Sequence, residues 1–348
     1  MSLDTLSEVL RAVRLRGAVF YYVSGDDDWA AEAPAACDIA AAVMPGVEHV
    51  IEYHVVARGN CWAAVVGAQP VRMSVGDVVM FPQGDAHVMS SAPGLRADPI
   101  PKEWVVATAR ASKPIPVAYH GIGVPAGPEP DERASTVLVC GFLGCDLKPF
   151  NPLISALPRL MHLPAPAGGD WVAPVMHQAV RESRELRPGS EAVLERLSEM
   201  MFVDAVRRHL EALPPGSTGW LAGLRDRVVG KALTLMHDRP AEPWTIELLS
   251  ERAGLSRSAL HERFVHFVGQ APMQYLGRWR MQAAARQLVE SHAPVASIAL
   301  DVGYDSEAAF SRAFKRIVGM PPGEWRRRHR RGAGATAGSG AAAADVAV

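Results

Sequence analysis

The chain has few cysteines, no long apolar run and almost no net charge, and each absence narrows what it can be. Four cysteines in 348 residues are too few for a disulfide framework, so we expect reduced thiols in a cytoplasmic protein. No run of apolar residues is long enough to predict a membrane span. The start, Met1-Ser2-Leu3-Asp4, has neither a basic segment nor an apolar core, so no secretory signal is expected.

The sequence also lacks the common catalytic signatures. It contains no phosphate-binding loop, no nucleophile elbow and no His-Glu-x-x-His pair, so we expect a protein that is not an enzyme. Its length and its hydrophobic fraction of 49% predict two or more domains of ordinary size.

The net charge of −1 is the balance of two halves of opposite sign. Residues 1–220 carry 18 lysines and arginines against 25 aspartates and glutamates, whereas residues 221–331 carry 18 against 11. An acidic half joined to a basic half is the asymmetry expected when one domain binds nucleic acid.

Hydrophobic patterning divides the acidic half into two regions. Residues 1–150 contain short apolar runs broken by turn residues, which predicts a β-rich domain. The expected strands are 50–56, 61–66, 78–81 and 136–140. Residues 151–213 change to helical spacing, with an apolar stripe at 192–193, 197, 200–201, 203, 206 and 210. This helix could mediate dimerisation, which we favour, or pack on its own barrel.

A linker, residues 214–221, precedes the basic region 222–331, which is predicted to be all helical. The tail 332–348 consists mostly of Gly, Ala and Ser and is expected to be disordered.

The basic region contains the same helical pattern twice. Gly254 recurs 49 residues later as Gly303. Phe264 recurs 50 residues later as Phe314. Each copy is a short helix, a glycine turn, a serine N-cap and a longer helix, which is typical of a helix-turn-helix. A helix expected from Pro272 to about Ser291 separates the copies by roughly 30 Å, close to the roughly 34 Å between successive major grooves.

These two copies carry a family resemblance. With Ala253-Gly254-Leu255-Ser256 in the first and Val302-Gly303-Tyr304-Asp305-Ser306 in the second, the region resembles the AraC/XylS family of bacterial transcription regulators. Gly319, Pro321-Pro322 and Trp325 fit the end of the same pattern. The resemblance implies a sequence-specific regulator of transcription, an activator, that binds double-stranded DNA as a homodimer and contacts RNA polymerase.

Polar and basic side chains remain on the exposed turns of each second helix when its apolar residues face the core. The residues expected to contact DNA are Arg257, Ser258, His261, Glu262, Ser306, Glu307, Ala308, Ser311, Arg312, Lys315 and Arg316. Arg312 is the best candidate for reading a base, because a guanidinium can bridge O6 and N7 of guanine. Glu262 could accept from a cytosine amine, or pair with Arg257 or His266. Arg278, Arg280 and the run 326–331 are expected to contact phosphates, with a solvated basic end as the alternative for the run.

The acidic half carries a second resemblance. Gly76, Pro82-Gln83-Gly84 and His87 have the spacing of the second cupin motif, and the region resembles the cupin-type sensor domain of some AraC-like regulators. This implies a small β-barrel with a cavity for a small-molecule effector. The expected fold is therefore α+β and multidomain, a cupin-like barrel with flanking helices followed by an all-α domain with two helix-turn-helix motifs.

The first, metal-binding cupin motif is incomplete. Only Glu52-Tyr53-His54 approximates it, although Glu52 and His54 share a strand face that His87 could meet. Cys61 and Cys140, on strands expected to be neighbours, could complete a mixed site. The candidate ligands for zinc or another divalent metal are thus His54, His87, Cys61 and Cys140. We favour the alternative, in which the histidines are hydrogen-bonded and the cysteines are small hydrophobic residues.

Two other functions stay open. One is a metal-dependent cupin dioxygenase or isomerase with an accessory DNA-binding domain, which would need an intact first motif. The other is an architectural protein that binds DNA without sequence preference.

Overall fold

The structure is a computed structural model that describes residues 4–13, 15–26, 28–109, 115–123, 125, 134–165, 178, 181–182, 185 and 187–337. The chain forms two compact units, each assembled from separate stretches of sequence. The helical unit comprises Met1–Arg14, Asp146–Ala156 and Leu213–Val348, and the β unit comprises Leu15–Cys145 and Leu157–Ala212. The domain boundaries drawn from sequence patterns stay predictions. No helix within the described ranges is long and apolar enough to cross a membrane.

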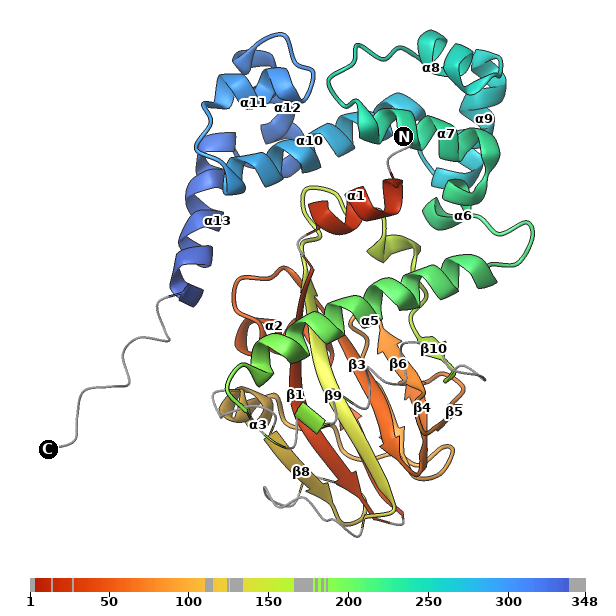
Figure 1. The fold of residues 1–348 in the computed structure, drawn as a ribbon, viewed down its shortest axis with the longest axis vertical. Coiled ribbons are helices and arrows are strands. Elements are labelled where there is room, and N and C mark those ends of the chain that lie inside the picture. The colour runs from red at the N-terminus through yellow and green to blue at the C-terminus, as the bar shows by residue number, and fades with distance from the viewer. Residues whose placement is uncertain are drawn as a thin grey trace, which may run out of the picture. The chain divides into compact units, whose positions relative to one another are not determined.

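The β unit contains two sheets (Figure 1). The strands are β1 (Arg16–Gly25), β2 (Ala30–Ala33), β3 (His49–Arg58), β4 (Asn60–Val65), β5 (Val71–Ser74), β6 (Val78–Phe81), β7 (His87–Ser90), β8 (Ile115–Tyr119), β9 (Thr136–Cys145) and β10 (Met161–Leu163). Six of them form one sheet in the order β10-β6-β3-β9-β1-β8, and four form the other in the order β2-β7-β4-β5. All neighbours pair antiparallel except β1 and β8, which are parallel.

The expected β-rich, cupin-like domain is confirmed, and each of the four expected strands is present. Every residue of β9 is buried, as are seven of the ten in β3, because these central strands are covered on both faces. Trp29, Met73 and Phe81 are fully buried in a core shared by both sheets.

The region from 151 to 213 is not helical throughout. It contains β10, whose Met161–Leu163 pairs with Met80 to Val78 of β6 at the edge of the larger sheet. A three-residue strand with one buried apolar side chain carries too short a pattern to separate from helical spacing.

The helix α5 (Ser190–Ala212) packs on the larger sheet (Figure 1). A Cβ at Gly17 of β1 would lie 2.7 Å from that of Ser198, so glycine permits the close approach. Tyr53 of β3 also shares a 2.6 Å hydrogen bond with Ser198. The buried face of α5 differs from the predicted stripe, because Val193 and Met200 are exposed. The described part of this unit also contains two shorter helices, α2 (Ala36–Val43) and α3 (Lys102–Thr108).

The helical unit contains the predicted repeat. Its helices are α1 (Thr5–Ala12), α6 (Trp220–Arg225), α7 (Arg227–Asp238), α8 (Ile246–Ala253), α9 (Arg257–Val268), α10 (Pro272–Glu290), α11 (Val295–Asp301), α12 (Glu307–Val318) and α13 (Pro322–Ala337), with the 3-10 turn η1 (Ile154–Ala156). The pairs α8–α9 and α11–α12 are the two helix-turn-helix motifs, and α10 joins them (Figure 1).

Local capping explains why each recognition helix begins where it does. Ser256 caps α9 by accepting from the N–H of Ala259, and Ser306 caps α12 by accepting from the N–H of Ala309. Gly254, which ends α8, has a φ of 82° that L side chains rarely adopt. Both motifs therefore end and restart their helices through residue types that are visible in the sequence.

Two stretches from the first half of the chain pack inside the helical unit. Helix α1 contacts α7 and α10, and Thr5 shares a 3.0 Å hydrogen bond with Thr234. In the segment 146–156, the ring of Phe150 lies edge-on against Tyr275, with a centroid distance of 5.3 Å. The helix α10 is thus held by residues more than 120 positions earlier in the sequence.

The end of α10 is capped by α13. Arg326 donates to the carbonyls of Leu288 and Ala293, and Arg330 donates to those of Val289 and Ser291. These two guanidinium groups are therefore engaged within the fold, contrary to the expectation of phosphate contacts. Helix α13 continues past Gly332 to Ala337, where the sequence predicts disorder, and residues 338–348 lie outside the described residues.

Candidate functional site

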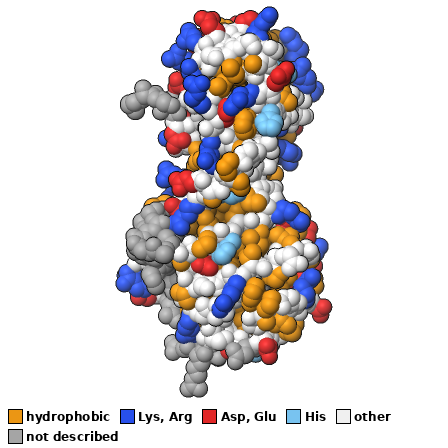
Figure 2. Space-filling model, turned by 90° about the vertical axis from the view of Figure 1, so that its right-hand side faces the viewer, with side chains coloured by type: hydrophobic (Ala, Val, Ile, Leu, Met, Phe, Trp, Pro, Cys, Tyr) orange, Lys and Arg blue, Asp and Glu red, His pale blue; other side chains and the backbone are white. Residues whose placement is uncertain are grey.

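The recognition helices α9 and α12 present polar and basic side chains outward. In the upper part of Figure 2, which shows the helical unit, Lys and Arg side chains are frequent on the surface. The aromatic residues of both helices point inward, since Phe264, Phe310 and Phe314 are fully buried. Trp244, Trp279 and Trp325 are also buried and therefore serve packing.

The structure leaves the residues expected to contact DNA on the surface. Of the eleven, only Ser311 is half-buried, and the other ten are exposed. Ser306 uses its hydroxyl to cap α12. The described part of the chain therefore has two exposed helix faces, one on α9 and one on α12, that are accessible to DNA.

Ion pairs already engage some basic residues near these faces. Arg257 donates to Glu247 at 2.8 Å, and Arg263 makes a bidentate pair with Asp226, which caps α7. Neither acidic partner was expected from the sequence, because Glu247 lies on α8 and Asp226 is the residue before α7. Arg280 donates to the carbonyls of Pro240 and Glu242, so its expected phosphate contact is wrong for the structure as it stands.

A second site lies inside the β unit, between its two sheets. Glu52 and His54 are two positions apart on β3 and therefore share a face of the larger sheet. His87 is the first residue of β7 in the smaller sheet. The turn before it needs Gly84, whose φ is 71° and whose carbonyl accepts the N–H of Ala36.

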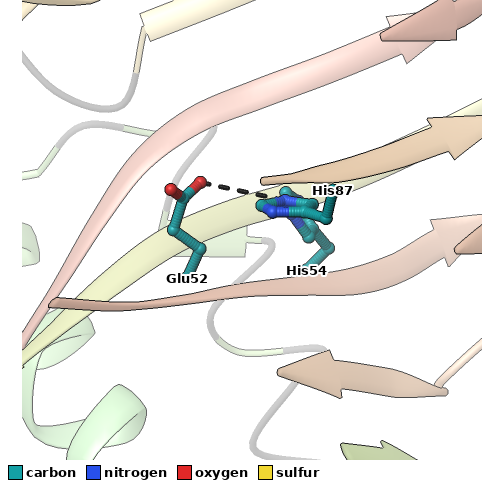
Figure 3. A group of neighbouring side chains, drawn as sticks. All are labelled: Glu52, His54 and His87. Carbon is teal, nitrogen blue, oxygen red and sulfur yellow. Dashed lines mark hydrogen bonds and ion pairs between the residues drawn. The ribbon is translucent and has the colours of Figure 1, made fainter. Parts of the chain in front are cut away.

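The three side chains meet in a buried cluster (Figure 3). The Nε2 atoms of His54 and His87 are 2.7 Å apart, which is a hydrogen-bond distance. Glu52 Oε2 lies 3.8 Å from Nε2 of His87, and all the ligand atoms lie within 4.8 Å of one another. This hydrogen bond between the histidines agrees with the interpretation favoured from the sequence.

The proton positions in this cluster follow from the fixed acceptors. Nδ1 of His87 is 3.1 Å from the carbonyl oxygen of Asp85, which can only accept, so Nδ1 carries the proton. The neutral ring then accepts the Nε2–H of His54. Nδ1 of His54 is left as an unprotonated acceptor, and it has no partner.

Burial controls the charge of the cluster. It raises the pKa of Glu52 to about 8 and lowers the pKa of His87 to about 4. The pKa of His54 is also lowered, first by burial and then by His87. All three groups are therefore uncharged near neutral pH when no metal is bound.

The predicted cysteine ligands are not part of this cluster. Cys140 lies opposite His54 on β9, but Cys61 is on β4 of the other sheet, so the expectation that their strands are neighbours is wrong. Burial raises the pKa of Cys61 to about 12 and that of Cys140 well above its ordinary value. Among the residues described, Glu52 joins the two histidines in place of the thiols.

The cluster fits a divalent metal by its donor chemistry. Two imidazoles and one carboxylate are a common ligand set for zinc and for iron(II), and Oε1 of Glu52 is buried without a partner. A metal would have to replace the hydrogen bond between the histidines. The donor types therefore suit a metal, but the two imidazole nitrogens lie closer together than two ligands of one metal ion would.

Glu52, His54 and His87 form one wall of a cavity whose remaining walls are apolar. Its volume is about 80 Å³, several times the roughly 10–15 Å³ that one water molecule needs. The aromatic residues that line it are Tyr21, Trp29, Trp104, Tyr119 and Phe142. None of these five residues was expected from the sequence to line a site.

Comparisons with known proteins agree with this arrangement. A model of the Cupin family matches residues 4–211, and one of a helix-turn-helix domain matches residues 249–328. An AraC-like transcription regulator of Streptomyces lividans is 34% identical over 327 residues, 93% of this chain and 98% of that protein. The chain belongs to the AraC-like transcription regulators.

Other members of the family and one solved structure are also similar to this chain. The transcriptional regulator AlkR of Acinetobacter baylyi is 25% identical, over 93% of this chain and 99% of its own length. The DNA-binding domain of AdpA, solved in complex with a target DNA, is 29% identical with a TM-score of 0.29, covering 30% of this chain and 95% of that one. The resemblance to AraC/XylS regulators inferred from the sequence is confirmed, and the curated relatives named here are regulators.

Proposed function

We propose that this AraC-like regulator binds a specific DNA sequence by placing α9 and α12 in successive major grooves of one duplex. The observation that carries the proposal is the repeat, two capped helix-turn-helix motifs joined by α10 with exposed polar faces on both recognition helices. The 19 residues of α10 span about 28 Å, close to the roughly 34 Å that separates successive grooves.

The exposed residues divide into two roles. Arg312, which is exposed on α12, would read a guanine edge, and Lys315 and Arg316 would hold phosphates. On α9, Ser258 and His261 would face bases. Arg257 has to leave Glu247 before it can reach DNA, so its contribution is smaller by the free energy of that exposed ion pair.

The occupant of the β-unit cavity controls the DNA-binding activity. It is either a small molecule or a divalent metal held by Glu52, His54 and His87. A bound metal would supply positive charge that ionises Glu52 and fixes both imidazoles. The cluster's own residues hold the two sheets together, because β3 and β7 belong to different sheets and meet through His54 and His87.

The chain offers a covalent route from the cavity to the helical unit. Strand β1 follows α1, and β9, which carries Cys140 and Phe142 of the cavity, leads directly into the segment 146–156. Both α1 and this segment pack on α10, the helix that joins the two recognition motifs. A ligand that shifts β1 or β9 would therefore bias the arrangement of α10 and its motifs.

The regulator acts as a homodimer and contacts RNA polymerase as an activator. Val193 and Met200 support the first point, because both are exposed on α5 although that helix packs its opposite face on the sheet. Family resemblance supports the second. Light scattering of wild type and of Met200→Lys tests the dimer, which should dissociate in the variant.

The test of the proposed function is selection of binding sites from random duplexes by the full chain. We expect one enriched motif with two blocks of about one helical turn spacing, bound at least 10³-fold more tightly than random duplex at fixed salt. An enriched motif with a single block would overturn the two-groove arrangement. Equal affinity for all duplexes would overturn sequence-specific regulation in favour of an architectural protein.

A metal-dependent enzyme is the second candidate, and the cluster of two histidines and one carboxylate is the observation that favours it. The names of the curated relatives favour the regulator. Metal analysis of the purified protein together with oxygen-consumption measurements separates the two. Catalytic turnover with any aromatic or aliphatic substrate would support the enzyme.

A further inference from the structure

The cavity of the β unit has aromatic walls contributed by distant parts of the sequence. Tyr21 and Trp104 stack with a centroid distance of 5.9 Å and an angle of 25° between their planes. The ring centroids of Trp29 and Tyr119 lie 6.1 Å apart, with an angle of 34° between the ring planes. Flat rings pack favourably on such surfaces by offset stacking, so the walls favour a planar ligand.

Some residues that line the same cavity have buried polar atoms without a partner. Within the described residues, six buried side-chain nitrogen or oxygen atoms lack a hydrogen bond. Three of the six belong to residues that line this cavity, namely Trp29 Nε1, Glu52 Oε1 and His54 Nδ1. A buried polar group without a partner is unfavourable, so a ligand that hydrogen-bonds with these atoms gains binding free energy from them.

The polar atoms differ in kind, which constrains the ligand further. Trp29 Nε1 can only donate, whereas Nδ1 of His54 accepts as its tautomer stands. A ligand group that both accepts and donates can satisfy both kinds of atom.

No lysine or arginine is among the described residues that line the cavity. An anionic ligand would therefore be buried without a positive partner and beside the carboxyl of Glu52, which is costly in an apolar environment. The lining thus disfavours carboxylates and phosphates.

We propose that the cavity binds a small uncharged molecule with an aromatic ring and a hydroxyl-type polar group, the chemical class of simple phenols. This inference rests on the proposed function, because it names the class of effector that the regulator senses. The ring lies against the aromatic walls, and the hydroxyl pairs with unpartnered polar atoms of the lining, those of Glu52 and His54 first.

Four probes of nearly the same size test this class on the full chain after treatment with a chelator. Phenol, toluene, benzylamine and benzoate share the ring and differ in polarity and charge. Titration calorimetry should show the tightest binding for phenol, about tenfold weaker binding for toluene, and none for benzoate or benzylamine. Tighter binding of either charged probe overturns the proposal, as does binding of none of the four.

Two variants with one matched control locate the binding. Ala31→Met places a flexible side chain in the cavity and should abolish binding of both phenol and toluene, whereas Ala64→Met, on β4 outside the cavity lining, should leave both unchanged. Glu52→Leu should lower the affinity for phenol about tenfold and leave toluene unaffected. Equal loss of both probes in Glu52→Leu would contradict a polar contact at that wall.

DNA binding supplies a readout that separates this inference from the proposed function. Binding of the selected duplex with no response to any probe would overturn the effector class and leave the DNA-binding proposal intact. Binding of phenol without sequence-specific DNA binding would leave the cavity assignment intact and overturn the regulator. The expected result is phenol binding together with a change of at least threefold in affinity for the selected duplex, absent in Ala31→Met.

Discussion

The side chain of Gln282 accepts the backbone N–H of Phe150 at 3.0 Å. Its amide nitrogen also donates to the carbonyl oxygen of Ala12 at 2.8 Å. One buried glutamine on α10 thus joins both stretches from the first half of the chain that pack inside the helical unit. In the proposed route from the cavity, this residue is where the segments that continue β1 and β9 meet the helix between the two DNA-binding motifs.

Replacing Gln282 with alanine should destabilise the helical unit and weaken the coupling. The change leaves the N–H of Phe150 and the carbonyl of Ala12 buried without partners, at about 1–3 kcal/mol each. Urea unfolding should show a loss of about 2–5 kcal/mol, and the response of DNA affinity to a cavity ligand should shrink.

Gln287→Ala, on the same helix, is the matched control, because Gln287 is only half-buried whereas Gln282 is buried. The control should change stability by less than about 0.5 kcal/mol. If both variants respond alike, the bridge at Gln282 has no special part in the fold or in signalling.

Acid should destabilise the helical unit through His237. Burial lowers the pKa of His237 to about 3, whereas a histidine in the unfolded chain titrates near 6.5. The unfolded chain therefore binds a proton that the folded protein does not, and stability is lost as the pH falls from about 6.5 towards 3. The contribution is about 1.4 kcal/mol per pH unit in this window.

The variant His237→Phe removes this dependence. It keeps the stacking on Trp279 and gives up the 2.8 Å hydrogen bond to Tyr275, which costs about 1 kcal/mol at pH 7. Urea unfolding at pH 7, 6 and 5 should show the variant overtaking wild type as the pH falls, while His292→Phe at an exposed site keeps the wild-type slope. Parallel profiles for His237→Phe and wild type would contradict a neutral buried ring.

The helix-turn-helix motifs could be predicted from the sequence because their signals are local. Ser256, Gly254 and their counterparts in the second motif fix helix ends within a few residues. The phosphate contact expected of Arg280 failed for a non-local reason, since its partners Pro240 and Glu242 come from a loop 40 and 38 residues earlier.

The cavity was only partly predictable because its walls come from eight separate helices and strands. Periodicity placed Glu52 and His54 on one strand face, and the cupin spacing placed His87 near them. Such patterns do not show which strands are neighbours. The strands of Cys61 and Cys140 were therefore expected side by side, although they belong to different sheets. Tyr21 and Trp104, 83 positions apart, carry no local signal that they stack.

Glu52 should make the metal-free β unit less stable as the pH rises. Burial raises the pKa of Glu52 to about 8, so the folded protein retains a proton that the unfolded chain loses above about 4.5. The stability associated with this group is complete below about pH 4.5 and is lost as the pH rises through 8. The free energy of unfolding of Glu52→Gln should therefore rise relative to that of wild type by an amount on the order of 3 kcal/mol between pH 5 and 8.

Zinc should reverse the stability order of wild type and Glu52→Gln at pH 8. Wild type should gain thermal stability on adding zinc at pH 8, and Glu52→Gln should gain less, because the amide is a poorer ligand than a carboxylate. Glu103→Gln, at an exposed position on α3, serves as the control and should follow wild type in both experiments. A zinc response of equal size in wild type and Glu52→Gln would exclude the carboxylate from the site.

Arg312 and Lys315 should differ in how their loss affects DNA binding. Arg312→Ala should weaken binding to the selected duplex by about 1–3 kcal/mol, with little effect on random duplex, and relax the preference at one base pair. Lys315→Ala should weaken both duplexes alike and lower the slope of log affinity against log salt by about 1. Both residues are exposed on α12, so neither change should disturb folding.

Fluorescence anisotropy at several salt concentrations measures both effects, and Arg286→Ala, which removes an ion pair to Glu290 on α10, is the control. Equal weakening of selected and random duplex by Arg312→Ala would assign that guanidinium to a phosphate and move base reading to other residues of the helix.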